Sequence, residues 1–330
     1  MTYAKTLSGT AAALAITAGA ALAEPGLIID LGGKFDKSFN ESAFNGAQRW
    51  VEETGGDYRE TELQSEAQRE QSMRRMAESG ANPIVVLGFA NASTLDAVAP
   101  DYPDTDFAIV DGVVDQPNVQ SIVFTEHTGS YLVGMLAALA SETGTVSFVG
   151  GMDIPLIQKF ACGYAQGVKA ANPDAEVIVN MTGTTPAAWN DPVKGAELAR
   201  AQFSQGSDVV YAAAGGTGVG VLQAAADEDR YSIGVDSNQN YLHPGSVLTS
   251  MLKRVDNAVY DVFSAGEDLE TGIVVKDLAS EGVGYAVDEN NETLLDQEML
   301  DIVEKAKADI AAGAVEVHDY TSDNSCPVAY

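Results

Sequence analysis

Short apolar runs alternate along this chain with longer stretches of helical periodicity. The first run covers residues 27–31, ends in two glycines, and is followed by a helical pattern over about 38–53. Similar runs recur at residues 83–87, 106–110, 119–124, 145–149, 177–181, 208–213, 231–235 and 247–252. Strands that alternate with helices predict βαβ units and a parallel sheet. Because the runs are nearly continuous rather than alternating, we expect strands buried on both faces.

This number of βα units is compatible with one closed barrel or with two doubly wound lobes. Polar segments interrupt the rhythm around residues 116–130 and 237–246, which favours two lobes with chain crossings at those places. We therefore expect an N-terminal lobe of residues 24–126 plus about 240–276. The C-terminal lobe is expected to contain residues 127–239 plus about 277–320, and residues 321–330 form a tail.

The first 23 residues have the pattern of a secretory signal peptide. Lys5 precedes a run without charge, and Ala21-Leu22-Ala23 provides a small-x-small cleavage site. The alternative is a membrane anchor, but the run is rich in Ala, Gly and Thr and poor in large aliphatic residues. No Cys follows the cleavage site, so we expect an exported, non-lipidated protein of a bacterial periplasm.

The composition limits the kinds of partner that we expect, because the chain is strongly acidic. It has 330 residues with 48 Asp and Glu against 18 Lys and Arg, a formal net charge of -30. A field of this sign repels phosphate backbones and anionic headgroups. The densest basic run, Arg69 with Arg74 and Arg75, is offset by glutamates on the same predicted helix. Nucleic acid and membrane surfaces are therefore not expected partners.

Two cysteines, Cys162 and Cys326, follow the predicted leader. In an oxidising compartment an even pair favours a disulfide, which would tie the C-terminal tail to a helix near the middle of the chain. The alternative is one buried thiol and one exposed thiol.

Candidate binding residues follow the predicted strands, because ligands of open α/β sheets bind at the carboxyl ends of the strands. The group contains carboxylates, amides, aromatic rings, glycine turns and one lysine, namely Asp30, Asp36, Ser38, Phe39, Asn40, Phe89, Trp189, Gly215, Gly216, Asp236 and Lys253. Aromatic faces with a few polar groups suit a flat, uncharged, hydroxylated ligand such as a nucleoside or a sugar. Ser38 and Asp36 have an alternative role as caps of the following helix.

Enzyme motifs are not supported by the sequence. The glycines that begin at Gly216 lack the third glycine of a dinucleotide fingerprint, since Val221 occupies that position, and no P-loop lysine follows. The three histidines are scattered, so neither a metal site nor a cofactor is expected. A periplasmic hydrolase that uses an acidic pair such as Asp36 and Asp236 remains the alternative from a different class.

Eight ordered motifs resemble the BMP (basic membrane protein) family of ABC-transporter substrate-binding proteins, the purine-nucleoside-binding group. They are Asp36-Lys37-Ser38-Phe39-Asn40 with Gly46, Gly129-Ser130-Tyr131-Leu132-Val133-Gly134, Val149-Gly150-Gly151-Met152-Asp153-Ile154-Pro155, Gly163-Tyr164-Ala165-Gln166-Gly167-Val168-Lys169, Trp189-Asn190-Asp191-Pro192, Gly215-Gly216-Thr217-Gly218, Ile233-Gly234-Val235-Asp236-Ser237 and Thr249-Ser250-Met251-Leu252-Lys253-Arg254. The resemblance implies an α/β type I periplasmic-binding-protein fold, with two doubly wound parallel-sheet lobes joined by a three-crossing hinge.

The resemblance also implies roles for the candidate residues. Phe39 and Trp189 would sandwich a base, one ring from each lobe. Carboxylates and amides would take ribose hydroxyls and base edges, and Lys253 with the glycine backbone would complete the polar ring; these residues are Asp30 or Asp36, Asn40, Asp236, Gly215 and Gly216.

The resemblance further implies a function. We expect a monomer that binds a nucleoside such as adenosine, guanosine or inosine and delivers it to an ABC permease in the inner membrane. Two alternatives of the binding class are a sugar or other small polar metabolite as ligand, and a sensing role beside a membrane receptor. The acidic field and the cleft carboxylates favour an uncharged nucleoside over its nucleotide.

Overall fold

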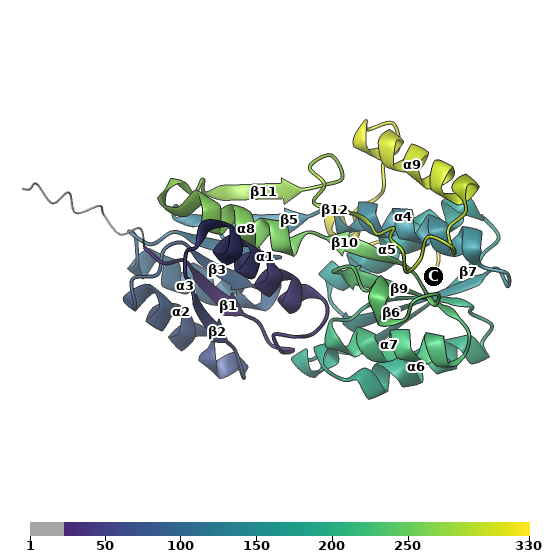
Figure 1. Cartoon of the computed structure of the whole chain (residues 1–330), viewed down its shortest axis with the longest axis horizontal. Helices are drawn as coiled ribbons and strands as arrows, with labels where there is room; N and C mark the ends of the chain where they lie inside the picture. The colour runs from purple at the N-terminus through teal and green to yellow at the C-terminus, as the bar shows by residue number, and fades with distance from the viewer. Residues whose placement is uncertain (1–22) are drawn as a thin grey trace, which may run out of the picture.

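The computed structural model describes residues 23–330, and it divides them into two lobes that lie side by side (Figure 1). The predicted leader at residues 1–23 lies outside the described residues except for Ala23. Each lobe is built on one six-stranded sheet. Within residues 23–330, none of the helices combines the length and the apolar character that crossing a bilayer requires.

The N-terminal lobe is a parallel sheet with helices on both faces. The sheet order is β11-β5-β4-β3-β1-β2, with strands β1 (Gly26–Ile29), β2 (Arg59–Glu62), β3 (Ile84–Leu87), β4 (Phe107–Val110), β5 (Val119–Phe124) and β11 (Gly272–Lys276). Side chains of one face pack against α1 (Phe39–Thr54) and α8 (Val255–Ala265). Those of the other face pack against α2 (Arg69–Glu78) and α3 (Ala92–Val98). Burial on both faces explains the continuous apolar runs.

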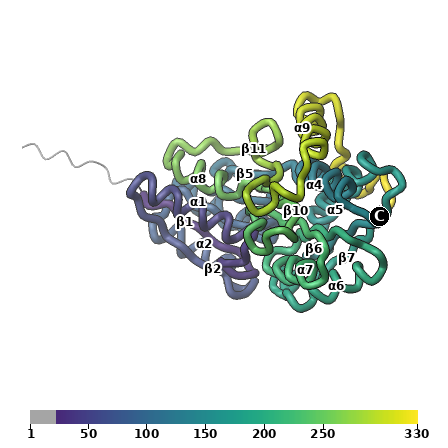
Figure 2. The backbone as a smooth tube through the Cα atoms, turned by 45° about the vertical axis from the view of Figure 1, so that its right-hand side comes forward, coloured from purple at the N-terminus to yellow at the C-terminus, as the bar shows by residue number. Residues whose placement is uncertain are grey.

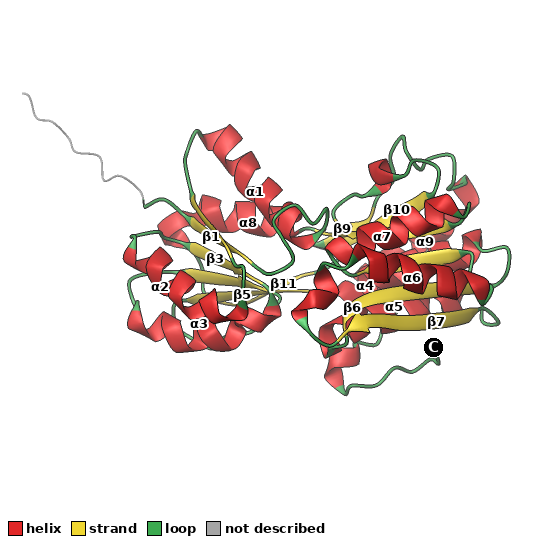
Figure 3. Cartoon of the chain, turned by 90° about the horizontal axis from the view of Figure 1, so that it is seen from below, coloured by secondary structure: helices red, strands yellow, loops and turns green. Residues whose placement is uncertain are grey.

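The C-terminal lobe repeats this arrangement with one antiparallel edge strand. Its order is β12-β10-β9-β8-β6-β7, with strands β6 (Thr145–Met152), β7 (Glu176–Gly183), β8 (Val209–Ala213), β9 (Tyr231–Asp236), β10 (Val247–Lys253) and the antiparallel β12 (Val283–Tyr285). The helices α4 (Glu126–Ala140) and α5 (Pro155–Ala171) cover one face. The helices α6 (Pro192–Ser204) and α7 (Gly216–Asp227) cover the other face (Figure 3).

The chain crosses between the lobes three times. The crossings lie between β5 and α4, between β10 and α8, and between β11 and β12. In Figure 2, α8 and β11 accordingly lie beside α1 and β5 of the N-terminal lobe, although they follow the second lobe in sequence. Two doubly wound lobes with a three-crossing hinge are the fold that the sequence predicted.

One predicted boundary was wrong. Residues 240–276 were expected in the N-terminal lobe, but β10 pairs in parallel with β9 and so belongs to the C-terminal sheet. The polar segment at 237–246 is a loop with one short helical turn that returns to the same sheet, and the crossing falls at Arg254 instead. The part that returns to the N-terminal lobe is therefore about 255–276.

The C-terminal end of the chain is attached to the second lobe. After α9 (Gln297–Ala311), the chain returns across α5 and includes a helical turn at Tyr320–Ser322. Cys162 of α5 and Cys326 form a disulfide, which confirms the bridge that the sequence favoured.

Candidate functional site

A cavity lies between the two lobes, where the carboxyl ends of both sheets face each other. About 80 Å³ of its space is open to water-sized molecules. Nine of the eleven predicted residues line it, namely Asp30, Asp36, Phe39, Asn40, Phe89, Trp189, Gly215, Asp236 and Lys253. Ser38 and Gly216 do not, although both adjoin residues that do.

Aromatic rings reach the cavity from both lobes. Phe39 is the first residue of α1, and Trp189 ends the short helical turn Pro186–Trp189 that follows β7. A Cβ at Gly151 would lie 2.1 Å from the Trp189 ring, so glycine at this position makes room for the indole. A Cβ at Gly32 of the opposite lobe would lie 3.5 Å from the Trp189 Cβ. The indole side chain is therefore placed at the junction of the lobes.

Asp36 caps the first helix as well as lining the cavity. Its carboxylate oxygens accept hydrogen bonds from the backbone N–H groups of Ser38, Asn40 and Glu41 at 2.8, 3.1 and 3.1 Å. Burial raises the pKa of Asp36 to about 6, against the lowering effect of these hydrogen bonds. The capping role considered for Asp36 is therefore confirmed. Ser38 occupies the N-cap position, but its side chain makes no capping bond.

The Ser38 side chain instead joins the two lobes. Its hydroxyl lies 2.5 Å from Oδ2 of Asp236, which follows β9 in the other lobe. Ser237 donates to the Ser38 carbonyl at 3.1 Å, and Gln239 donates to the Lys37 carbonyl at 2.9 Å. These bonds form only when the lobes approach each other, so the structure shows a closed arrangement.

Lys253 is buried in the cavity wall as the centre of an ion cluster. Its ammonium lies 2.6 Å from Asp111 and 2.9 Å from Glu126, and all three side chains are at most 8% exposed. Burial alone would lower the pKa of Lys253, but Asp111, Glu126 and Asp236 raise it above its usual range. Lys253 is therefore a neutralised structural cation rather than a free charge in the site.

Asp111 lines the cavity and Glu126 pairs with the cavity lysine, but neither was among the residues predicted from the sequence. Asp111 directly follows the predicted strand at 106–110, and Glu126 lies two residues beyond the strand at 119–124. Both residues closely follow a predicted strand, which is the position for which Asp30 was selected. Their pairing with Lys253 joins β4, α4 and β10 and has no signal in the sequence, because Lys253 lies more than a hundred positions from both carboxylates.

Three buried oxygens in the cavity wall have no hydrogen-bond partner among residues 23–330. They are Oδ1 of Asp30, Asn40 and Asp111. The Asn40 amide nitrogen donates to the carbonyls of Asp30 and Gly33, both at 3.2 Å, which fixes its oxygen as an acceptor. Buried acceptors without partners are costly. The cavity is therefore suited to a ligand that presents hydrogen-bond donors.

Two lobes, three crossings and a cavity closed between strand ends define a two-lobed solute-binding protein of the type I periplasmic class. A solute-binding protein of an ABC transporter system from Aeropyrum pernix has this fold, with a TM-score of 0.81 and 29% identity over 89% of this chain and 92% of that chain. The fold of an ABC solute-binding protein from Conexibacter woesei is also similar, with a TM-score of 0.71, 23% identity, and coverage of 90% and 99%.

Residues 26–317 match the family described as "ABC transporter substrate-binding protein PnrA-like", and this chain belongs to that Bmp family. The "ABC transporter nucleoside-binding protein BmpA" of Lactococcus lactis is 33% identical over 316 residues, which cover 88% of each chain. "Basic membrane protein D" of Borreliella burgdorferi is 31% identical over 276 residues, covering 80% of this chain and 79% of the relative. The expected family and fold are thus confirmed, and this protein is an ABC transporter substrate-binding protein.

Proposed function

We propose that this protein binds an uncharged nucleoside, preferentially a purine nucleoside, between its lobes and delivers it to an ABC permease. The observation that carries the proposal is a cavity between the lobes that is lined by Phe39 and Trp189 from opposite lobes and by buried acceptors. Rings from two lobes can hold both faces of a base only after closure. A relative that is named a nucleoside-binding protein supports this ligand class.

The polar groups of the cavity favour hydroxyl and N–H donors. Asp30, Asn40 and Asp111 each offer a buried oxygen without a hydrogen-bond partner, although that of Asp30 lies 3.8 Å from the Arg69 guanidinium. Carboxylates form strong charge-assisted bonds with ribose hydroxyls. A nucleotide phosphate would bring further acceptors and negative charge to this wall. The one lysine, Lys253, is already held by Asp111 and Glu126. We therefore propose selection of the nucleoside against its monophosphate.

Hydrolysis by Asp36 and Asp236 is a weaker proposal than binding. The Asp36 oxygens accept three backbone N–H groups, and Asp236 accepts the Ser38 hydroxyl. Neither carboxylate is arranged as a free general base. The leader-like pattern of residues 1–23 supports an exported, non-lipidated carrier in a bacterial periplasm. We propose that this carrier acts as a monomer.

Calorimetric titration with adenosine, guanosine, inosine, uridine, ribose and inosine monophosphate tests the proposal. We expect a purine nucleoside to bind, and Trp189→Ala to weaken its binding by about 1–3 kcal/mol through loss of stacking. Trp50→Ala is the matched control, because Trp50 packs on Phe263 outside the cavity and should leave the dissociation constant unchanged. Binding of ribose or the monophosphate in preference to every nucleoside would refute the ligand assignment, and release of free base would refute a pure binding function.

Nucleoside affinity is expected to fall as the pH drops below 6. Burial raises the pKa of Asp36 and of Asp236 to about 6, so both are ionised at pH 7.5 and increasingly protonated below pH 6. If the complex needs one of these carboxylates ionised, the affinity at pH 5 should be about tenfold weaker than at pH 7.5. Titrations at pH 8.5, 7.5, 6 and 5 measure this, and the two highest values serve as the control because they should agree. Constant affinity down to pH 5 would contradict it.

A further inference from the structure

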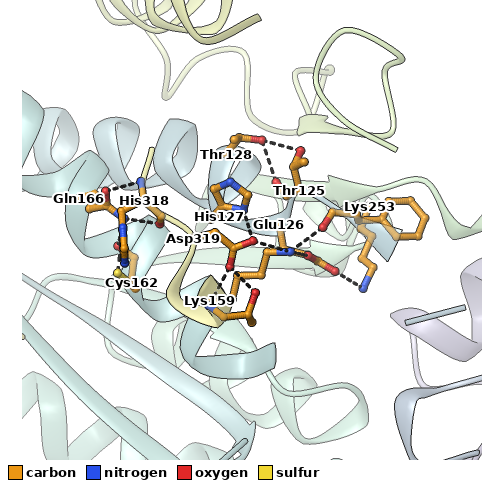
Figure 4. Close-up of polar contacts among 12 residues, drawn as sticks. Thr125, Glu126, His127, Thr128, Lys159, Cys162, Gln166, Lys253, His318 and Asp319 are labelled. Atoms are coloured by element: carbon orange, nitrogen blue, oxygen red, sulfur yellow. Dashed lines mark hydrogen bonds and ion pairs between the residues drawn. The ribbon is translucent and has the colours of Figure 1, made fainter. Parts of the chain in front are cut away.

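The last residues of the chain form a strap over one face of α5. We define the strap as residues 317–330. Lys159, Cys162 and Gln166 are spaced three and four residues apart, so they lie on one face of the helix. Each of the three contacts the strap, as Figure 4 shows for Lys159 with Asp319 and for Gln166 with His318.

Three different interactions attach the strap. The Gln166 side-chain amide donates to the His318 carbonyl and accepts from the His318 N–H, both at 2.9 Å. Cys326 is bonded covalently to Cys162 one turn away. These two attachments place Asp319, whose Oδ2 lies 3.4 Å from the Lys159 ammonium.

Lys159 connects the strap to the hinge. Its ammonium donates to the carbonyl of Phe124, the last residue of β5, at 2.7 Å. It also lies 2.8 Å from Oε2 of Glu126, which begins α4 directly after the first crossing between the lobes. The other oxygen of Glu126 pairs with Lys253 in the cavity wall. Asp319 is therefore linked to the cavity lysine by three successive ion pairs, through Lys159 and Glu126.

Asp319 is the second negative charge beside the Lys159 ammonium, in addition to Glu126. Glu126 is 1% exposed and lies between two ammonium groups, Lys159 and Lys253. His127 also faces Asp319, at 3.7 Å, but burial lowers the pKa of His127 to about 4, so it is neutral at pH 7. Without Asp319, Glu126 would be the one carboxylate that pairs with Lys159. The ion pair between Glu126 and Lys253 would then be weaker.

The strap also contacts the helix that carries part of the cavity wall. Leu156, Ile157 and Phe160 line the cavity from the first turns of α5. The strap contacts the same turns, at Lys159 and at Gln158, whose side-chain oxygen accepts a hydrogen bond from the Tyr330 hydroxyl at 3.0 Å. Movement of this end of α5 would therefore displace the cavity wall and the Lys159–Glu126 pair together.

We propose that the C-terminal strap is part of the binding apparatus, with Asp319 as a positioning residue that holds Lys253 in place through Lys159 and Glu126. The proposal rests on the function proposed above. It predicts that ligand affinity depends on a segment that does not itself line the cavity.

The test measures purine-nucleoside binding by Asp319→Asn at a temperature well below unfolding. We expect about a three- to tenfold weaker dissociation constant, since residues of one salt-bridge network interact by this order. Asp319→Glu should restore most of the affinity, which a loss of general stability would not explain. Asp323→Asn is the matched control, because Asp323 is in the same strap but bonds only within it, to Ser325 and His318.

A double-mutant cycle with Cys326→Ser separates the strap from an isolated charge effect. Both changes release the same contact, so the combined variant should bind no more than about twofold weaker than the worse single variant. Unchanged affinity in Asp319→Asn, or a loss that Asp319→Glu does not restore, would overturn the proposal.

A measurement without ligand keeps this test independent of the proposed function. Hydrogen exchange of the free protein should become faster in the first turns of α4 and α5 in Asp319→Asn, whereas α2 of the other lobe should not change. If the wild type binds no nucleoside but this exchange pattern appears, the ligand assignment fails and the positioning role stands. Unchanged exchange in α4 and α5 overturns the positioning role.

Discussion

Replacing Lys253 by methionine is expected to lower the free energy of unfolding by about 3–5 kcal/mol. Methionine retains the length of the side chain but removes the ammonium between Asp111 and Glu126, at 2.6 and 2.9 Å. Both carboxylates are almost fully buried and would lose their shared counter-ion. Leaving a buried charge unpaired costs far more than the intact pair contributes. The same variant should bind nucleoside poorly, because two carboxylates in the wall would rearrange.

Urea denaturation at pH 7.5 measures this loss. The matched control is Lys276→Met, because Lys276 pairs with Asp261, whose side chain is 55% exposed. Exposed pairs contribute little, so this control should change stability by less than about 1 kcal/mol. Equal effects of the two substitutions would show that the Lys253 cluster does not depend on its buried charges.

The pH dependence of the Lys253→Met variant provides a second check with a definite sign. Without the ammonium, burial would raise the pKa of the Asp111 carboxyl in the folded state further above its unfolded value, whereas Glu126 would still pair with Lys159 at 2.8 Å. A raised carboxyl pKa contributes stability that is present at low pH and is lost as the pH rises. The deficit relative to the wild type should therefore shrink between pH 7.5 and pH 5. A deficit that grows on acidification would contradict the explanation.

The sequence predicted the buried strands well and the edge strands poorly. Inner strands such as β4 and β8 are buried on both faces, so they leave continuous apolar runs that mark their positions within a few residues. The edge strand β2 has the sequence RETE and is half exposed, and β11 exposes Ile273 and Val275. The sequence of β2 has no pattern that distinguishes it from a loop, whereas the β-branched run Ile273-Val274-Val275 of β11 is typical of a strand and was not among the predicted runs.

The strand-end criterion located the site because it depends on topology. In doubly wound sheets the carboxyl ends of the strands meet the cleft whatever the side chains are, so Asp30, Phe89 and Asp236 were found before any contact was known. The hydrogen bonds and ion pairs between these side chains were not predictable from topology. The bond between Ser38 and Asp236, and the pairing of Lys253 with Asp111, each join residues more than a hundred positions apart.

Two motifs of the family resemblance are explained by the contact of α4 with α5. A Cβ at Gly134 of α4 would lie 2.2 Å from the Tyr164 carbonyl oxygen, and one at Gly163 of α5 would lie 2.3 Å from that of His127. The two helices therefore approach so closely that their backbone atoms are in direct contact. Glycine is required there for space, since neither position has a positive φ. These glycines set the distance between the hinge helix and the helix that lines the cavity.

Gly167→Ala is expected to destabilise the protein by about 3 kcal/mol, because the contact it disturbs is with backbone. A Cβ at Gly167 would lie 1.9 Å from the Tyr131 carbonyl oxygen, so α4 and α5 would have to separate.

Gly218→Ala in α7 is the matched control, because its Cβ would meet the Ala212 Cβ at an ordinary 3.5 Å. Alanine favours helix over glycine by about 1 kcal/mol, so this control should be neutral or stabilising. Thermal and urea unfolding of both variants compare the two. A loss below 1 kcal/mol in Gly167→Ala would mean that α5 can move away from α4 at little cost. The strap, which is bound to α5, would then have no rigid partner through which to position the hinge.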